Sequence, residues 1–254
     1  GIKRGGKLYQ MSFLGGAKAS DLCVVGDVGK RTTGTTIHFW PDGKYFDSSK
    51  FSVPRLKHVL KAKAILCLGL EVVFKSEQTG EEESWQYQGG LKDYLADQFE
   101  GVESLPAEPF TGSMQGETEE VDWAVMWLPE PGELLAESYV NLIPTPQGGT
   151  HVNGLRVGLL DAVREFCEFR NLVPRGVKLA PDDLWENCAY VLSVKMQEPQ
   201  FSGQTKERLS SRECASFVSG VVKDAFALWL NQHVKQAEAL AEFIISRAQK
   251  RLRK

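Results

Sequence analysis

The feature that most restricts the fold is an almost wholly apolar stretch, Tyr190 to Met196, set between two long helical patterns. A strand with so little polar alternation is typical of the centre of a sheet whose two faces are both covered. The earlier helical pattern repeats apolar residues from Val152 to Phe166 after the turn Gly148-Gly149-Thr150. Since a strand pattern also precedes that helix, strand, helix and strand imply a crossover connection.

Two further strands and two helices complete this part of the chain. Val121–Trp127 alternates apolar and polar residues, and an apolar run covers Ser138–Ile143, so the two predict a pair of antiparallel strands. Ser210 and Glu213 have the spacing of a capping box and predict a helix start. A last helix is expected over about residues 234–253.

The first third of the sequence predicts a sheet followed by a helix and a hairpin. Period-2 patterning over residues 7–14 and 36–40 predicts strands, the stripe over 53–65 predicts a helix, and residues 70–87 predict a hairpin. A short helical pattern beginning at Leu91 is followed by proline and glycine punctuation, which favours a domain boundary near Ala96. We therefore expect an α+β chain with domains at 1–96 and 97–254.

Composition excludes several classes of protein. The chain has 254 residues, of which 42% are hydrophobic and 25% charged, and it lacks an apolar run long enough to cross a bilayer. The net charge of −3 provides no overall positive field for nucleic acid, so any DNA contact must be local. Five scattered cysteines without a C-x-x-C pair encode neither a disulfide framework nor a zinc site, which favours a reducing cytoplasm. The absence of an initial methionine leads us to expect a piece of a longer chain.

Conventional catalytic motifs do not occur in the sequence. The four histidines are far apart, and no G-x-S-x-G, H-E-x-x-H or Walker A pattern is present. One polar loop, residues 199–206, lies between the buried strand and the following helix, where side chains can meet ligands. Gln204 and Lys206 of this loop have the chemistry to hold the terminal phosphate of a nucleotide. The alternative interpretation is a solvated loop lysine.

A second candidate is the segment Lys30–Thr35. Gly34 allows close backbone approach, and the hydroxyls of Thr33 and Thr35 have the chemistry to meet a base edge through water. The alternative is simply the start of a strand. From its own pattern this segment carries a weak signal.

Five ordered motifs carry a resemblance to a known family. They are Lys30–Pro41, Tyr139–Pro144, Gly148–His151, Val191–Lys195 and Gln204–Lys206. In order and spacing they resemble the B subunits of bacterial type II topoisomerases, over the whole length of the chain. Ala189-Tyr190 and the stretch Gln204–Ser211 are closer to the topoisomerase IV branch of this family than to the gyrase branch, which remains the alternative.

The resemblance implies a fold and a nucleotide site. It implies the C-terminal part of a GHKL-type α/β sandwich, followed by a transducer domain with a left-handed βαβ crossover. By match to the family, Thr35 helps to hold adenine through water, Arg4 lies at the mouth of that pocket, and Gln204 and Lys206 reach the γ-phosphate. The implied cofactors are ATP and Mg²⁺, with no metal ligand assigned in this chain. Arg156 matches an arginine that faces DNA, and a solvated helix-face arginine is its alternative.

The resemblance also sets expectations about partners and activity. The family forms a self-dimer through its ATPase region, works with the A subunit of topoisomerase IV, and passes one DNA duplex through another. This chain lacks the family's N-terminal glutamate base, magnesium-binding asparagine, adenine-binding aspartate and ATP lid, so we expect it not to hydrolyse ATP alone. A transducer that binds no nucleotide is one alternative. A mismatch-repair or chaperone ATPase of the same superfamily is another, disfavoured by the motifs at Gly148–His151 and Gln204–Lys206.

Overall fold

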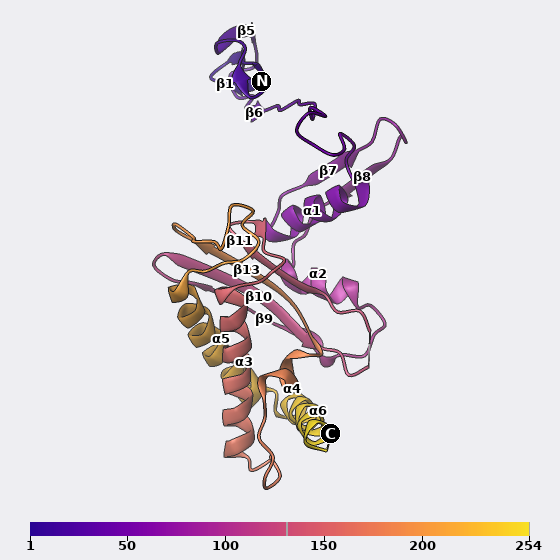
Figure 1. Cartoon of the computed structure of the whole chain (residues 1–254), viewed down its shortest axis with the longest axis vertical. Helices are drawn as coiled ribbons and strands as arrows, with labels where there is room; N and C mark the ends of the chain where they lie inside the picture. The colour runs from indigo at the N-terminus through magenta and orange to yellow at the C-terminus, as the bar shows by residue number, and fades with distance from the viewer. Residues whose placement is uncertain (131, 254) are drawn as a thin grey trace. The chain divides into compact units, whose positions relative to one another are not determined.

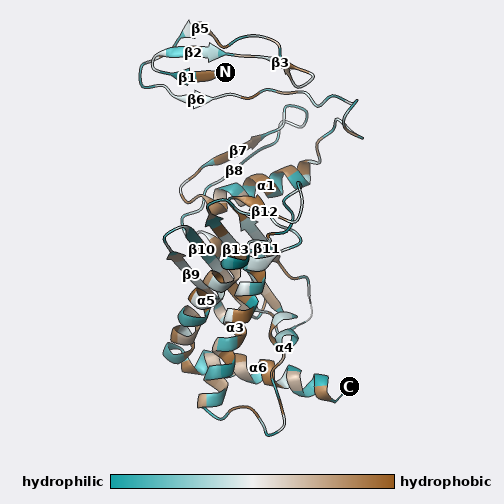
Figure 2. Ribbon diagram, turned by 60° about the vertical axis from the view of Figure 1, so that its left-hand side comes forward, coloured by the Kyte–Doolittle hydropathy of each residue, from teal (hydrophilic) through white to brown (hydrophobic). Residues whose placement is uncertain are grey.

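The computed structural model describes residues 1–130 and 132–253, and the chain divides into two compact units, Gly1–Leu56 and Lys57–Lys254 (Figure 1). The first unit contains a four-stranded sheet in the order β5-β2-β1-β6 and a small hairpin, β3–β4 (Figure 2). Its strands are β1 (Ile2–Arg4), β2 (Lys7–Gln10), β3 (Phe13–Leu14), β4 (Ala17–Lys18), β5 (Cys23–Asp27) and β6 (Gly34–Thr35).

The strand predicted over residues 36–40 is wrong. The sheet strand here is β6, Gly34–Thr35, and the following residues are not in a strand. The reason is the length of the partner, because β6 pairs only with β1, and Gly1 makes the last backbone hydrogen bonds of that ladder with Thr36. Alternation alone does not make a strand where no neighbouring strand offers partners. The strand predicted over 7–14 is likewise divided, into β2 and β3.

The helix and the hairpin predicted over residues 53–87 lie at the start of the second unit. The helix expected over 53–65 is confirmed as α1 (Val53–Leu66), which begins just before the division between the units. The predicted hairpin is β7 (Val72–Lys75) paired antiparallel with β8 (Glu82–Trp85), and α2 (Leu91–Gln98) follows. The predicted boundary near Ala96 falls inside α2, and the division of the chain into domains at 1–96 and 97–254 stays a prediction.

A five-stranded sheet in the order β12-β11-β13-β10-β9 forms the centre of this unit. Its strands are β9 (Leu105–Gln115), β10 (Glu119–Trp127), β11 (Ala136–Val140), β12 (Ile143–Pro144) and β13 (Cys188–Met196). The apolar strand predicted at 190–196 is confirmed as the central strand. It runs parallel to β11 and antiparallel to β10. The crossover between the two parallel strands runs through α3 (Thr150–Phe169).

Two predictions about this sheet need correction. The strands at 121–127 and 138–143 were expected to pair with each other, but β13 lies between them and pairs with both. The long strand β9 falls in the stretch whose prolines and glycines favoured a linker. Gly112 has a specific place there, because a Cβ at this position would meet the Trp123 indole at 2.0 Å. The glycine therefore makes room for a core tryptophan rather than marking a turn.

Helices cover both faces of the sheet. One face packs against α3, α5 (Arg212–Gln232) and α6 (Val234–Leu252), and the other against α1 and α2. Side chains of β10 alternate between the two faces. Trp123 and Trp127 pack on the face covered by α3, α5 and α6, while Ala124 and Met126 pack on the face covered by α1 and α2. Figure 2 shows both apolar and polar residues along these helices, as expected for helices with one buried side. Burial on both faces explains why β13 has little polar alternation.

Candidate functional site

Residues 197–211 connect β13 to α5 and form the polar loop expected from the sequence. Two backbone hydrogen bonds close it into a hairpin, from Ser202 N to Arg208 O at 3.0 Å and from Ser210 N to Gln200 O at 2.8 Å. Gln204 and Lys206 lie in the exposed tip of this hairpin, residues 203–207, which follows the end of the central strand in the sequence. The structure therefore brings these two predicted residues together on one projecting loop.

Lys206 has an unusual backbone conformation for a side-chain-bearing residue. Its φ is +57°, in the left-handed region, and its backbone N–H donates to Gly203 O at 3.3 Å. A lysine in this region costs on the order of 1 kcal/mol and persists only where the surrounding structure imposes it. Its ammonium lies 5.8 Å from the centre of the Phe201 ring, and in the described part of the chain it forms no ion pair. The loop thus fixes the backbone of Lys206, while no carboxylate among the described residues neutralises the charge of its ammonium.

The helix start after the loop differs from the predicted capping box. The N-cap of α5 is Ser211, and no side-chain cap hydrogen bond forms there. The Ser211 hydroxyl instead accepts a hydrogen bond from Gln200 N at 2.9 Å. The N-cap is therefore one residue later than the predicted Ser210, and its hydroxyl closes the loop instead of capping the helix.

A buried polar cluster lies beneath the start of α3. Thr145 Oγ1 is 3.0 Å from His151 Nε2 and donates to Ser138 O at 3.0 Å, while Ser138 Oγ donates to Thr145 O at 3.0 Å. All three residues are buried. If each hydroxyl proton is used once, Nε2 of His151 carries the proton and donates to Thr145. Nδ1 of His151 has no partner among the described residues.

Burial lowers the pKa of His151 to about 4, from an ordinary value of 6.5. The folded state therefore binds this proton less readily than the unfolded state, and stability is lost as the pH falls from 6.5 toward 4. At pH 5 we expect a loss of about 2 kcal/mol relative to pH 7 from this group alone. Urea unfolding of the chain and of His151→Gln at both pH values measures it. An equal acid-dependent loss in the two proteins would contradict the assignment.

In the first unit, Arg4 and Thr35 lie on neighbouring strands. Thr35 of β6 is directly opposite Ile2 of β1, and Arg4 is two residues further along β1. Side chains directly opposite or two residues apart share a face of a sheet, so Arg4 and Thr35 are diagonal neighbours, about 7–8 Å apart. Both are exposed. Their roles toward a nucleotide stay predictions.

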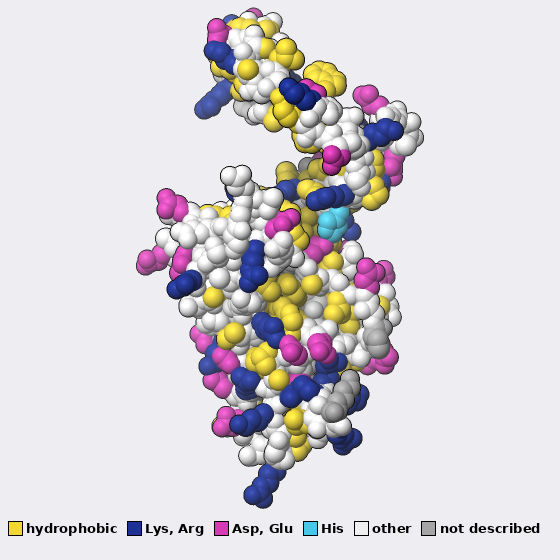
Figure 3. Space-filling model, in the orientation of Figure 1, with side chains coloured by type: hydrophobic (Ala, Val, Ile, Leu, Met, Phe, Trp, Pro, Cys, Tyr) yellow, Lys and Arg dark blue, Asp and Glu magenta, His cyan; other side chains and the backbone are white. Residues whose placement is uncertain are grey.

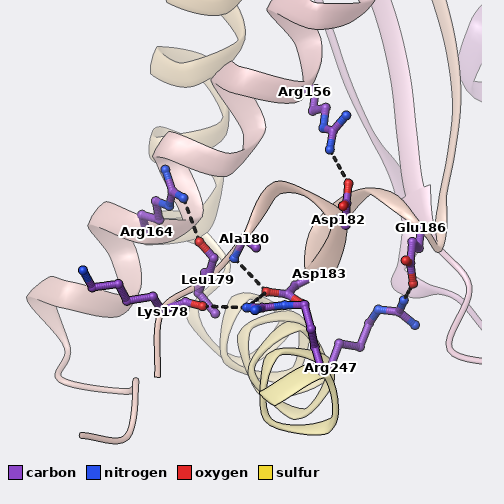
Figure 4. A network of polar contacts seen from close by, with 10 residues as sticks. Arg156, Arg164, Lys178, Leu179, Ala180, Asp182, Asp183, Glu186 and Arg247 are labelled. Carbon is purple, nitrogen blue, oxygen red and sulfur yellow. Dashed lines mark hydrogen bonds and ion pairs between the residues drawn. The ribbon is translucent and has the colours of Figure 1, made fainter. Parts of the chain in front are cut away.

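Arg156 of α3 is not free in this structure. Its guanidinium forms an ion pair with Asp182 of α4 (Pro181–Trp185) and lies 6.0 Å from the centre of the Trp185 ring. Figure 4 shows Arg156 pointing toward Asp182. A carboxylate so close neutralises much of the positive charge that a DNA-facing arginine would offer.

Polar contacts in the same region join the last helix, α6, to α4. Asp183, which is 3% exposed, receives two hydrogen bonds of 2.9 Å from Arg251 and one of 2.7 Å from Ala180 N (Figure 4). Burial opposes ionisation of this carboxyl, yet the Arg251 and Ala180 hydrogen bonds hold its pKa below the ordinary value. Arg247 of α6 also pairs with Glu186. Charges at this end of the unit therefore largely satisfy one another.

Charges of both signs mix over the visible face of the second unit (Figure 3). The local contacts agree, because Lys57, Lys92, Lys195 and Lys223 are all paired with glutamates. Over the described residues there is no group of three or more His, Cys, Asp or Glu side chains placed to hold a metal ion. In the same part of the chain, no helix has the length and apolarity needed to cross a membrane.

The family is decided by the match of residues 90–254 to the DNA gyrase B family. The chain belongs to the DNA gyrase B family. Within it, the chain is 66% identical over 252 residues to the B subunit of DNA topoisomerase 4 from Escherichia coli K12, covering 99% of this chain and 40% of that protein. The corresponding Francisella tularensis protein is 43% identical with the same coverage. The chain thus spans about two fifths of the length of the curated relatives it matches.

Solved structures of the DNA gyrase B family agree with the fold. A topoisomerase IV ATP binding domain of Francisella tularensis, bound to a small-molecule inhibitor, matches with a TM-score of 0.84 at 42% identity, covering 99% of this chain and 68% of that one. The 43K ATPase domain of Thermus thermophilus gyrase B, bound to an aminocoumarin, matches with a TM-score of 0.78 at 29% identity, covering 98% and 68%. The α+β fold class predicted from the sequence is confirmed.

Sequence reasoning missed several residues that shape the candidate site. Asp182 was not expected beside Arg156, since a five-residue helix, α4, brings it there and that helix was not predicted. Gln147 and Glu207, which join two loops, were not singled out either. The consecutive glycines Gly148 and Gly149 were the available signal, because such a pair often permits a close backbone approach.

Proposed function

We propose that this chain is the ATPase-transducer region of a type II DNA topoisomerase B subunit of the topoisomerase IV kind. In the intact subunit it would couple ATP binding and hydrolysis to closure of a dimeric clamp and passage of one DNA duplex through another, giving decatenation and relaxation. The observation that carries the proposal is the exposed tip with Gln204 and with Lys206, which has no ion-pair partner among the described residues, in a chain 66% identical to the B subunit of DNA topoisomerase 4.

The chemistry assigned to the tip is recognition of a terminal phosphate. Lys206 provides a full positive charge and Gln204 an amide donor two residues away, and both are exposed. A cation that contacts the outermost phosphate loses that charge-assisted contact once the phosphate leaves. The tip would then be free to move with the rest of its unit. Hydrolysis is in this way converted into domain motion.

Within the first unit, Arg4 and Thr35 are the proposed contacts to ATP. ATP supplies the phosphoanhydride whose cleavage drives the cycle, and these side chains offer a cation and a hydroxyl on one face of the β1–β6 pair. For Mg²⁺ we assign no ligand in this chain, and the described residues contain no group of three or more His, Cys, Asp or Glu side chains placed to hold a metal ion. No step of the proposal depends on a metal held by this chain.

The enzyme-class alternative is a gyrase B subunit. We expect the intact subunit, reconstituted with the topoisomerase IV A subunit, to decatenate linked circles and to relax supercoils when ATP is present. Introduction of negative supercoils into relaxed plasmid would contradict the proposal and favour gyrase. Omission of ATP is the control.

The non-enzymatic alternative is a transducer that binds no nucleotide. Calorimetry with a non-hydrolysable ATP analogue compares the 254-residue chain with the intact subunit. We expect binding by the intact subunit and little by the chain alone, because the resemblance assigns further contacts to residues outside it. Tight binding by the chain alone would overturn that expectation and place the complete pocket within these residues.

Arg156 is proposed to face DNA in the clamp. Its ion pair with Asp182 leads to a prediction that can be tested. Asp182→Asn removes the competing carboxylate, so we expect the intact subunit to bind duplex DNA about threefold more tightly at low salt, with a salt dependence steeper by about one counterion. Fluorescence anisotropy across a salt series measures both quantities. Asp161→Asn, on α3 and 3.8 Å from Arg164, is the control of equal charge change. Equal effects of the two variants would remove the role of the pair.

A further inference from the structure

The hairpin that carries Gln204 and Lys206 is joined along its base to a second loop. Leu209 N donates to Gly148 O at 3.0 Å, and Thr150 N donates to Leu209 O at 3.1 Å. Gln147 N donates to Glu207 O at 3.0 Å, directly beside Lys206. The base of the hairpin is therefore one strand of a small ladder whose other strand is the segment 147–150.

Side chains reinforce this ladder at its exposed end. Gln147 Nε2 donates to Glu207 Oε2 at 2.8 Å. Both residues are exposed, and Glu207 is the neighbour of Lys206 in the sequence. The hydrogen bond is thus the side-chain contact between segment 147–150 and the tip that lies nearest to the proposed phosphate-binding lysine.

The ladder closes only because position 149 has no side chain. A Cβ at Gly149 would lie 2.3 Å from Leu209 O and 2.5 Å from Leu209 N, so its absence permits the backbones to meet. The φ of Gly149 is +136°, a conformation that other residues rarely adopt. Two independent constraints, space and backbone conformation, therefore require glycine at this point.

Segment 147–150 is itself hydrogen-bonded to the buried polar cluster of Ser138, Thr145 and His151. Gly148 N donates to Thr145 O at 2.8 Å, and Thr145 is bound on its other side to Ser138 and His151 in the buried cluster. Ser138 belongs to β11 and His151 to α3. A continuous series of hydrogen bonds thus runs from the core of the unit to the base of the tip.

We propose that segment 147–150 is a positioning element that sets where Gln204 and Lys206 are held, with Gln147, Gly149 and Glu207 as its positioning residues. The proposal rests on the proposed function of the tip and adds a second loop to it. Lys206 cannot position itself, since its ammonium forms no ion pair among the described residues and lies 5.8 Å from the centre of the Phe201 ring, and its backbone is in a costly conformation. The ladder supplies the surrounding structure that this conformation requires.

The Gln147–Glu207 contact allows a test that leaves the fold intact. Gln147→Glu replaces an amide donor with a carboxylate facing Glu207, so the hydrogen bond is lost and like charges repel. The double variant Gln147→Glu with Glu207→Gln restores one amide and one carboxylate with their places exchanged. Gln232→Glu, at the exposed end of α5, adds the same charge away from the ladder.

Two readouts are combined. Hydrogen exchange of the nucleotide-free chain, followed by mass spectrometry on peptides covering residues 203–209, is expected to be about fivefold faster in Gln147→Glu. In the intact subunit the same variant is expected to lower ATP turnover several-fold with a smaller change in KM. The exchanged pair is expected to restore both quantities, and Gln232→Glu to change neither.

The outcomes separate this inference from the proposed function. Unchanged exchange in Gln147→Glu, or faster exchange with normal turnover, would overturn the positioning role. A loss that the exchanged pair fails to rescue would overturn it as well. If Lys206→Ala leaves turnover normal, the proposed function fails, whatever the exchange data show about the ladder.

Discussion

Replacing Lys206 with alanine in the intact subunit is expected to lower ATP turnover about a hundredfold, a loss of transition-state stabilisation of about 2.7 kcal/mol. The physical reason is that the ammonium is proposed to meet charge that grows on the terminal phosphate during transfer, and alanine offers no donor in its place. Turnover is measured with a coupled ATPase assay, alongside decatenation at saturating ATP. Both activities should fall together.

Two variants make this result interpretable. Lys235→Ala removes an exposed lysine at the start of α6, so it matches the change in charge without touching the tip. Lys206→Arg keeps the charge but changes the geometry from a compact ammonium to a planar fork, and an intermediate loss is expected. If Lys206→Ala retains normal turnover and normal decatenation, Lys206 has no part in the mechanism.

The central layer of the second unit could be predicted because its signals are local and strong. A largely apolar strand at 190–196 and a helical stripe from Val152 to Phe166 each identify their own element, and the crossover follows from their order. Pairing was harder to predict. β10 and β11 both pair with β13, and a strand inserted from far beyond β11 in the sequence leaves no mark on the patterns of its two neighbours.

In the candidate site too, the features with a local sequence pattern could be predicted, and those that depend on distant contacts could not. Gln204 and Lys206 could be found because a polar loop after a buried strand is a local pattern, whereas their placement depends on contacts between loops 60 residues apart. The helix start shows the limit of local spacing, since the predicted cap was Ser210, whereas the N-cap is Ser211 and its hydroxyl accepts a hydrogen bond from Gln200 N. Arg156 was singled out by resemblance, but its pairing with Asp182 comes from the approach of a separate helix.

Gly158→Ala is expected to destabilise the chain by about 3 kcal/mol, because α3 and α5 pack closely at this glycine. A Cβ there would lie 2.6 Å from Ser219 O and 3.1 Å from Lys223 N, both backbone atoms of the facing helix. Backbone atoms cannot rotate aside as a side-chain end can, so the helices must separate and their shared core must loosen. Urea unfolding followed by circular dichroism measures the loss.

Gly220→Ala is the matched control, because Gly220 lies in α5 with nothing within 4 Å of the position its Cβ would take. Alanine there has only its helix propensity to contribute and should stabilise the chain by about 0.5–1 kcal/mol. The two substitutions are chemically identical, so helix propensity alone predicts gains for both. Opposite signs would therefore isolate the close approach of α3 and α5, while a gain at both positions would mean that the helices do not pack as tightly as this structure has them.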